Sequence, residues 1–111
     1  MRRILLDENL PHKLRHLLRG HDVRTVAYQG WAGLSNGELL RAVEEAGFEV
    51  MITADHGIRY QQNRKNSSVG LIVLSDNDEI VLKTNVEFIL EAIDAAEPVG
   101  LIWVDFERPD V

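Results

Sequence analysis

Short runs of apolar residues recur along the chain, and each gives way to a polar turn. The run at residues 3–6, Arg-Ile-Leu-Leu, leads into Asp7-Glu8-Asn9, which is typical of a buried strand followed by a turn. Residues 23–28 alternate and contain β-branched side chains, which favours a second strand. Similar runs predict three more strands, at residues 48–53, 69–74 and 99–104.

Amphipathic segments separate these runs. The first opens at Leu10-Pro11 and ends at Gly20, and its leucines fall on one helical face: Leu10, Leu14, Leu17 and Leu18. Capping boxes, in which a Ser or Thr is followed three residues later by Glu, predict helix starts at 35–38 and 84–87. We also expect a short helix at 58–63, a mobile loop after it and a turn at 75–78.

The regular alternation of strand and helix predicts an α/β/α fold, with a central parallel sheet of about five strands and helices on both faces. The 111 residues suit a single domain over 1–111, and no repeat or linker divides them. Apolar residues make up 45% of the chain and charged residues 27%, which argues against intrinsic disorder.

The chain contains no Cys, which excludes a disulfide framework, a thiol nucleophile and a Cys-ligated metal. Its apolar runs have the length of strands, far below that of a membrane span. The N-terminal residues lack the apolar core of a signal peptide. A cytoplasmic protein without a membrane segment is therefore expected.

The net charge of −6 argues against broad, nonspecific binding of nucleic acid, but the charge is unevenly spread. Residues 1–24 hold six basic and three acidic residues, a net of +3, whereas the rest holds six basic and fifteen acidic residues, a net of −9. Solvated faces would explain this distribution. Alternatively, a basic face beside an acidic site would hold a phosphate backbone next to a metal ion.

Acidic residues follow four of the predicted strands, where an open parallel sheet places its functional site: Asp7, Asp55, Asp76 and Asp105. Because converging carboxylates repel one another, a hard divalent cation such as Mg²⁺ or Mn²⁺ would stabilise them. Asp7 and Asp55 are the first candidates as ligands. Asp76 lies in an Asp-Asn-Asp run that is also ordinary turn sequence. Glu38 is expected to cap its helix, although a ligand role remains open.

Other polar and aromatic residues give weaker signals. His12 and His16 would share a helix face as exposed partners of basic residues. His56, beside Asp55, would act in proton transfer or be a bystander. Trp31, between two glycines, would stack on a base or plug the loop against the core.

Three segments resemble the small stand-alone PIN-like domains of bacteria and archaea whose function is unknown: residues 5–11 (Leu-Leu-Asp-Glu-Asn-Leu-Pro), 36–40 (Asn-Gly-Glu-Leu-Leu) and 52–55 (Ile-Thr-Ala-Asp). The likeness covers nearly the whole chain. It implies a PIN-like α/β/α sandwich and a ribonuclease that depends on Mg²⁺ or Mn²⁺. It further implies an RNA substrate and, as for many PIN domains, a toxin with a cognate antitoxin and a homodimer.

Position by position, the resemblance implies three catalytic and metal-binding residues: Asp7, Glu38 and Asp55. Asn36 stands where relatives often carry Asp, and a fourth ligand would come from Asp76 or Asn77. We expect one cation to join Asp7 and Asp55, which requires their carboxyl groups to lie within about 10 Å of each other. The candidate phosphate contacts are Arg15, Arg19 and Arg59.

Two alternatives accompany the nuclease hypothesis. The first is a catalytically silent PIN-like module that binds a protein. The second is a degenerate response-regulator receiver domain, whose acidic pair, phosphoryl acceptor and fourth-strand Ser would be Asp7-Glu8, Asp55 and Ser75. A receiver needs a Lys after the fifth strand and a last helix, whereas this chain has Asp105 there and six residues beyond it.

Overall fold

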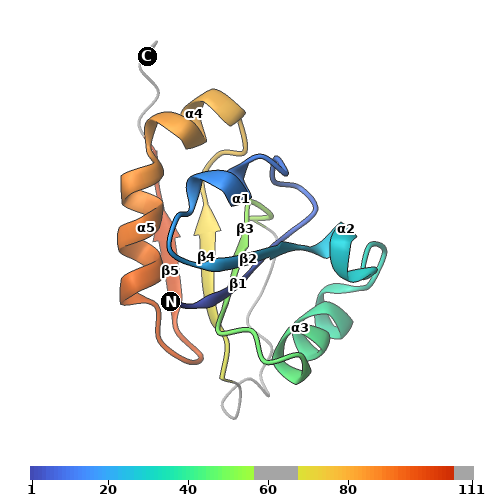
Figure 1. The fold of residues 1–111 in the computed structure, drawn as a ribbon. Helices are drawn as coiled ribbons and strands as arrows, with labels where there is room; N and C mark the ends of the chain where they lie inside the picture. Colours follow the sequence, from blue (N-terminus) through green and yellow to red (C-terminus); the bar gives the residue numbers. More distant parts are fainter. Residues whose placement is uncertain (57–67, 107–111) are drawn as a thin grey trace.

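The structure, a computed structural model, describes residues 1–56 and 68–106 (Figure 1). Its five strands are β1 (Arg3–Leu6), β2 (Asp22–Thr25), β3 (Val50–Thr53), β4 (Gly70–Leu74) and β5 (Leu101–Val104). Its helices are α1 (Leu14–Leu17), α2 (Val26–Gln29), α3 (Asn36–Glu45), α4 (Glu79–Thr84) and α5 (Val86–Ala95). The short helix and loop expected after residue 57 fall outside the described residues.

All five strands run parallel, in the order β2-β1-β3-β4-β5, as the alternating pattern predicts. The chain steps from β1 to β2 on one side and then crosses to β3 on the other side of β1. The gap beyond β1 and β3 is therefore the topological switch point, where doubly wound folds bind their ligands. Leu6 is the register partner of Ile52, so Asp7 emerges from the sheet beside Thr53.

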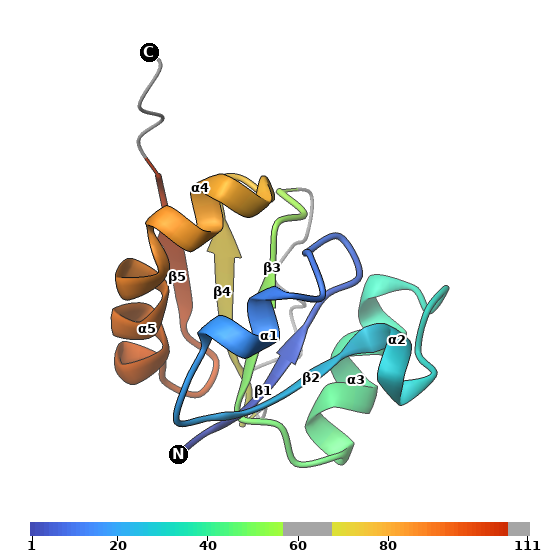
Figure 2. The same ribbon diagram turned by 45° about the horizontal axis from the view of Figure 1, so that its top comes forward.

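Each face of the sheet is covered by its own helical layer, which confirms the α/β/α architecture. Alternate strand residues such as Leu6 and Ile52 pack with leucines and isoleucines of α1, α4 and α5. Their neighbours, such as Leu5 and Met51, pack with Val26 of α2 and the apolar residues of α3. Figure 2 shows α1 and α4 together near the carboxyl ends of the strands.

Two elements are shorter than predicted. The first helix was expected from Leu10 to Gly20, but α1 covers one turn, because three-residue turn bonds such as that from Leu14 N to the Pro11 carbonyl (3.1 Å) precede it. The expected leucine stripe nevertheless joins the core, because Leu10, Leu14 and Leu18 are buried and Leu17 is partly buried against them. The second strand was expected to reach residue 28, but Thr25 ends it, since its hydroxyl accepts from the Tyr28 amide (3.1 Å) and starts α2.

The two predicted capping boxes have different outcomes. The box at 35–38 forms as expected and begins α3. The box at 84–87 does not form, because the unpredicted helix α4 ends at Thr84 and the next residue, Asn85, makes no side-chain cap bond. The side chain of Asp78 starts α4 by accepting from the amides of Ile80 and Val81. The expected turn at 75–78 is thus the approach to a helix.

Candidate functional site

The carboxylate of Asp7 lies just beyond β1 and is buried, with 7% of the residue exposed. Its Oδ1 accepts from the Glu8 amide at 2.8 Å, and its Oδ2 accepts from the Thr53 hydroxyl at 2.7 Å. The Asp7 amide extends the sheet ladder by donating to the Ile52 carbonyl (2.9 Å). Because each carboxylate oxygen has two lone pairs, both oxygens keep a position for a further partner.

Thr53 joins the end of β3 to this carboxylate, and the residue is fully buried. Its hydroxyl donates to Asp7 and accepts from the Asp55 amide at 3.0 Å. The same oxygen accepts from the side-chain amide of Asn9 at 3.4 Å. One hydroxyl therefore connects the two acidic segments, so the expected meeting of β1 and β3 at this edge is confirmed. The separation of the two carboxyl groups stays a prediction.

Asn9 ties three strand ends together. Its side-chain oxygen accepts from the Ala54 amide (3.2 Å), and its own carbonyl accepts from the Asn77 side chain (3.0 Å). The sequence suggests only a turn or cap at Asn9. Its bridging role depends on β1, β3 and β4 being neighbours, which the local sequence does not encode.

The other two predicted ligands have local structural roles. Asp76 accepts from the Asp78 amide (2.9 Å), and Asp78 in turn caps α4. Glu38 is exposed and accepts from the amide and hydroxyl of Ser35, at 3.1 and 2.9 Å. These hydrogen bonds, and to a smaller degree the charge of Arg41, lower the pKa of Glu38. The capping role of Glu38 is confirmed, and ligand roles for Glu38 and Asp76 stay predictions.

His56 turns toward the β4–β5 side of the sheet. Its Nε2 lies 3.0 Å from the carbonyl of Leu74, at the end of β4, and its ring centroid lies 5.1 Å from that of Trp103 on β5. A carbonyl only accepts, so this contact holds Nε2 as the donor. Both contacts are with β4 and β5, which lie on the far side of β3 from β1, the strand that leads to Asp7. Trp31 packs edge-on against Phe48, with centroids 6.0 Å apart, as a loop plug would.

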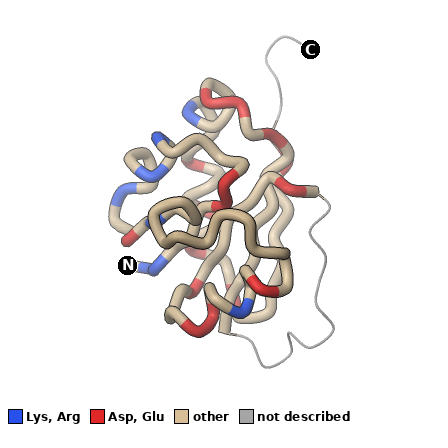
Figure 3. The backbone as a smooth tube through the Cα atoms, turned by 90° about the vertical axis from the view of Figure 1, so that its right-hand side faces the viewer, with Lys and Arg blue, Asp and Glu red and all other residues tan. Residues whose placement is uncertain are grey.

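The basic residues of the N-terminal part gather on one side of the molecule, where the chain begins (Figure 3). Arg15 on α1 and Arg19 in the following turn are both exposed. Arg59 lies outside the described residues. The uneven charge of the sequence is therefore also uneven in space, and the alternative of a basic face beside an acidic site stays a prediction.

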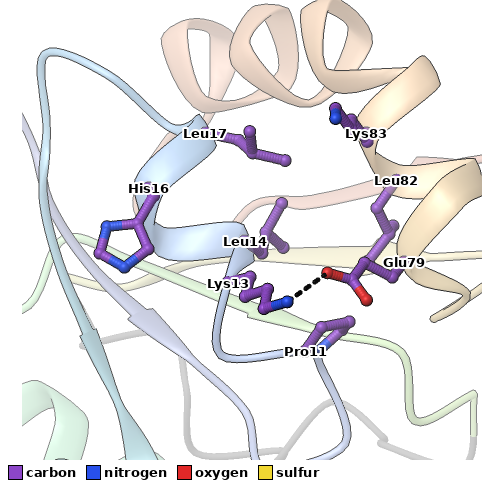
Figure 4. A pocket seen from close by; sticks show the side chains of 8 residues that line it. All are labelled: Pro11, Lys13, Leu14, His16, Leu17, Glu79, Leu82 and Lys83. Carbon is purple, nitrogen blue, oxygen red and sulfur yellow. Dashed lines mark ion pairs between the residues drawn. The ribbon is translucent and has the colours of Figure 1, made fainter.

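A groove of about 460 Å³ separates α1 from α4, and Leu14, Leu17 and Leu82 point toward one another across it (Figure 4). Lys13 forms an ion pair with Glu79 at 3.7 Å at the side of this groove. Both side chains are exposed, so the pair contributes little stability.

An oxygen-only donor set suits a hard divalent cation, and Mg²⁺ is usually held by one or two carboxylates and several waters. Asp7 and Asp55 supply two carboxylates from neighbouring strand ends. Within residues 1–56 and 68–106, no group of three or more His, Asp or Glu side chains could hold a metal ion.

The part of the chain that the structure describes also contains no helix long and apolar enough to cross a membrane.

No curated protein and no solved structure matches the chain. The strand order alone does not separate the nuclease and receiver hypotheses, because receiver domains share it. A family model described as a PIN-like domain matches residues 2–76, which include β1 to β4, Asp7, Thr53 and Asp55. The match confirms the resemblance read from the sequence motifs, and the chain belongs to the PIN-like domain family.

Proposed function

We propose that this protein is a metal-dependent nuclease whose substrate is RNA. The observation that carries the proposal is the Asp7 carboxylate, buried at the switch point of a PIN-like sheet and held by the Glu8 amide and the Thr53 hydroxyl. A buried carboxylate with fixed oxygens is prepared to bind a cation without first reorganising. Membership of the PIN-like family supports nuclease chemistry at this edge.

Asp7 and Asp55 would hold Mg²⁺ or Mn²⁺ directly. Such an ion, when bound, lowers the pKa of a bound water and neutralises charge on the scissile phosphate. Thr53 fixes the rotamer of Asp7, and Asn9 keeps the β1 and β3 loops together. Glu38 and Asp76 would act through a ligand contact or a bound water. Their local hydrogen bonds favour the water-mediated role.

Arg15, Arg19 and Arg59 are the proposed phosphate contacts. Arg15 and Arg19 are both exposed, and Arg15 lies on α1, the first helix after β1. A local basic face attracts a phosphate backbone even when the whole chain carries a net charge of −6. The RNA would therefore approach from the side of α1.

The test is incubation with mixed RNA in Mg²⁺, in Mn²⁺ and in EDTA, with wild-type protein and with Asp7→Asn. We expect cleavage by the wild type in either metal, none in EDTA, and a loss of roughly 100-fold or more in Asp7→Asn, since even an outer-shell change can cost that much. Asp94→Asn, at an exposed position of α5, is the matched control and should cleave normally. Cleavage that survives both EDTA and Asp7→Asn would contradict the proposal.

A catalytically silent PIN-like binding module is the second candidate. It is favoured by the engagement of Glu38 in its capping box, which occupies one oxygen of a proposed catalytic acid. This candidate predicts no metal-dependent cleavage and no difference in Mn²⁺ binding, measured by calorimetry, between the wild type and Asp7→Asn. A role as the toxin of a toxin–antitoxin pair and a homodimeric state also belong to the proposal and rest on family resemblance. The proposed cytoplasmic location rests on the sequence, whose apolar runs are of strand length.

A further inference from the structure

A hollow of about 400 Å³ lies against the edge strand β2, between α1 and α2. It is lined by Arg15, Val23, Arg24, Thr25 and Tyr28. Thr25 is the register partner of Leu6 at the end of β1, so this hollow adjoins the strand end from which Asp7 emerges. The hollow thus reaches the carboxyl ends of the strands, where the proposed metal site lies.

Tyr28 projects its ring to the surface from a fixed backbone. The residue is 73% exposed, although its amide is held by the Thr25 hydroxyl at 3.1 Å. Gly30 ends α2 directly afterwards in the left-handed conformation (φ 77°), which suits glycine. The buried residue of α2 is Val26, so the core does not account for the position of the tyrosine ring.

One guanidinium group lies over the ring, and a second arginine lines the hollow. The Arg24 guanidinium carbon lies over the ring, 5.4 Å from its centroid, and its Nε is held by Asp22 at 3.4 Å. One face of the ring is therefore covered by a cation, and the opposite face is the one available to a ligand. Arg15 also lines the hollow, and among the described residues it belongs to no ion pair.

We propose that Tyr28, Arg24 and Arg15 form a subsite that stacks one unpaired base of a single-stranded RNA beside the metal site. An exposed aromatic ring next to guanidinium groups is the combination that binds single strands, because every base has a face to stack and a phosphate close by. A base in a duplex is already stacked and would not enter. The inference rests on the proposed function for its RNA substrate. A protein partner is a weaker explanation, because the residues that dominate protein–protein binding usually lie in a larger desolvated patch than this cationic hollow.

The test measures binding without cleavage. The wild-type protein is titrated in EDTA into a fluorescein-labelled single-stranded RNA of about 12 nucleotides, and anisotropy gives the dissociation constant. The variants are Tyr28→Ala, which removes the ring, and Tyr28→Phe, which keeps it. Phe88→Ala is the matched control, because Phe88 is also an exposed aromatic residue (58%) but lies on α5 beside the opposite edge strand. Thermal unfolding checks that all variants are folded.

We expect Tyr28→Ala to weaken binding roughly five- to tenfold and Tyr28→Phe to change it by less than about twofold. Phe88→Ala should bind like the wild type. A matching RNA that lacks its bases, and a duplex of the same sequence, should both be insensitive to Tyr28→Ala. Equal binding by the wild type and Tyr28→Ala would overturn the subsite and leave the hollow to a protein partner. Because no cleavage is measured, an inactive protein that shows the Tyr28 effect would contradict only the proposed nuclease.

Discussion

At the scale of single residues, the Thr53 hydroxyl is what turns two acidic strand ends into one site. It is a donor to Asp7 and an acceptor for the Asp55 amide, so it relates the two acids that the sequence places 48 positions apart. The closeness of the segments that carry Asp7 and Asp55 can be predicted from the sequence, because the ends of parallel strands meet at one edge. The role of Thr53 cannot, because it depends on the register of β1 against β3 and on a rotamer inside the sheet.

Replacing Thr53 by Val, which has a similar shape but no hydroxyl, should remove this link. The buried Asp7 Oδ2 would lose its donor, and we expect the free energy of unfolding, measured in urea, to fall by about 1–3 kcal/mol. RNA cleavage should fall roughly 10- to 100-fold, since Thr53 orients a proposed metal ligand.

Thr53→Ser, which keeps the hydroxyl, is the variant that separates orientation from packing. It should retain most of the cleavage activity even though it loses a buried methyl group. Thr84→Val, at an exposed position at the end of α4, controls for the substitution itself. If Thr53→Val cleaved RNA as fast as Thr53→Ser, the hydroxyl would not position Asp7.

At the scale of elements, local sequence determines where a helix starts only when the capping residues do not compete. The box at 35–38 was predictable because Ser35 and Glu38 have no rival. The box at 84–87 has the same sequence pattern, but Asp78 caps the preceding helix α4. Thr84 is the last residue of α4, so it does not cap the start of α5. The end of β2 at Thr25 was missed for a related reason, because a β-branched Thr suits both a strand and an N-cap.

The capping box makes the stability of the protein depend on pH in a defined direction. Hydrogen bonds from Ser35 lower the pKa of the folded Glu38 below its ordinary value of 4.5. This contribution is therefore fully present above 4.5 and is lost as the pH falls through the lowered folded value. Relative to Glu38→Gln, the wild type should gain stability at neutral pH, and the advantage should shrink on acidification.

Urea midpoints of the wild type and Glu38→Gln, measured from about pH 7 to about pH 3, check this prediction. Glu91→Gln, at an exposed position of α5, serves as the matched control. A difference between the wild type and Glu38→Gln that grew on acidification would contradict the capping assignment. The same variant tests chemistry, because a role through water predicts a smaller loss of cleavage than that of Asp7→Asn.

At the scale of the whole molecule, two features combine to give the candidate site its surroundings. The strand order places β1 between β2 and β3, so the end of β1 that leads to Asp7 lies between β2, where Arg15 of α1 lines a hollow, and the strand ends followed by Asp55 and Asp76. The alternating pattern predicts the parallel sheet and its two helical layers. It does not predict the order of the strands, since that order depends on which side of β1 each crossover takes. The strand order in turn decides where the basic N-terminal residues lie in the molecule (Figure 3).

This asymmetry predicts how RNA cleavage should respond to salt. Each phosphate contact to a single strand contributes about 0.7 to the slope of log binding against log salt concentration. If Arg15 contacts a phosphate, Arg15→Ala should raise KM, leave kcat nearly unchanged and lower the salt slope of kcat/KM by about 0.7. Arg41→Ala is the matched control, because Arg41 is exposed on α3, in the opposite helical layer. Steady-state kinetics from about 50 to about 200 mM salt measure both variants. Equal salt slopes of kcat/KM for Arg15→Ala and Arg41→Ala would show that RNA binding depends only on the overall charge of the protein. The proposed approach from the side of α1 would then be wrong.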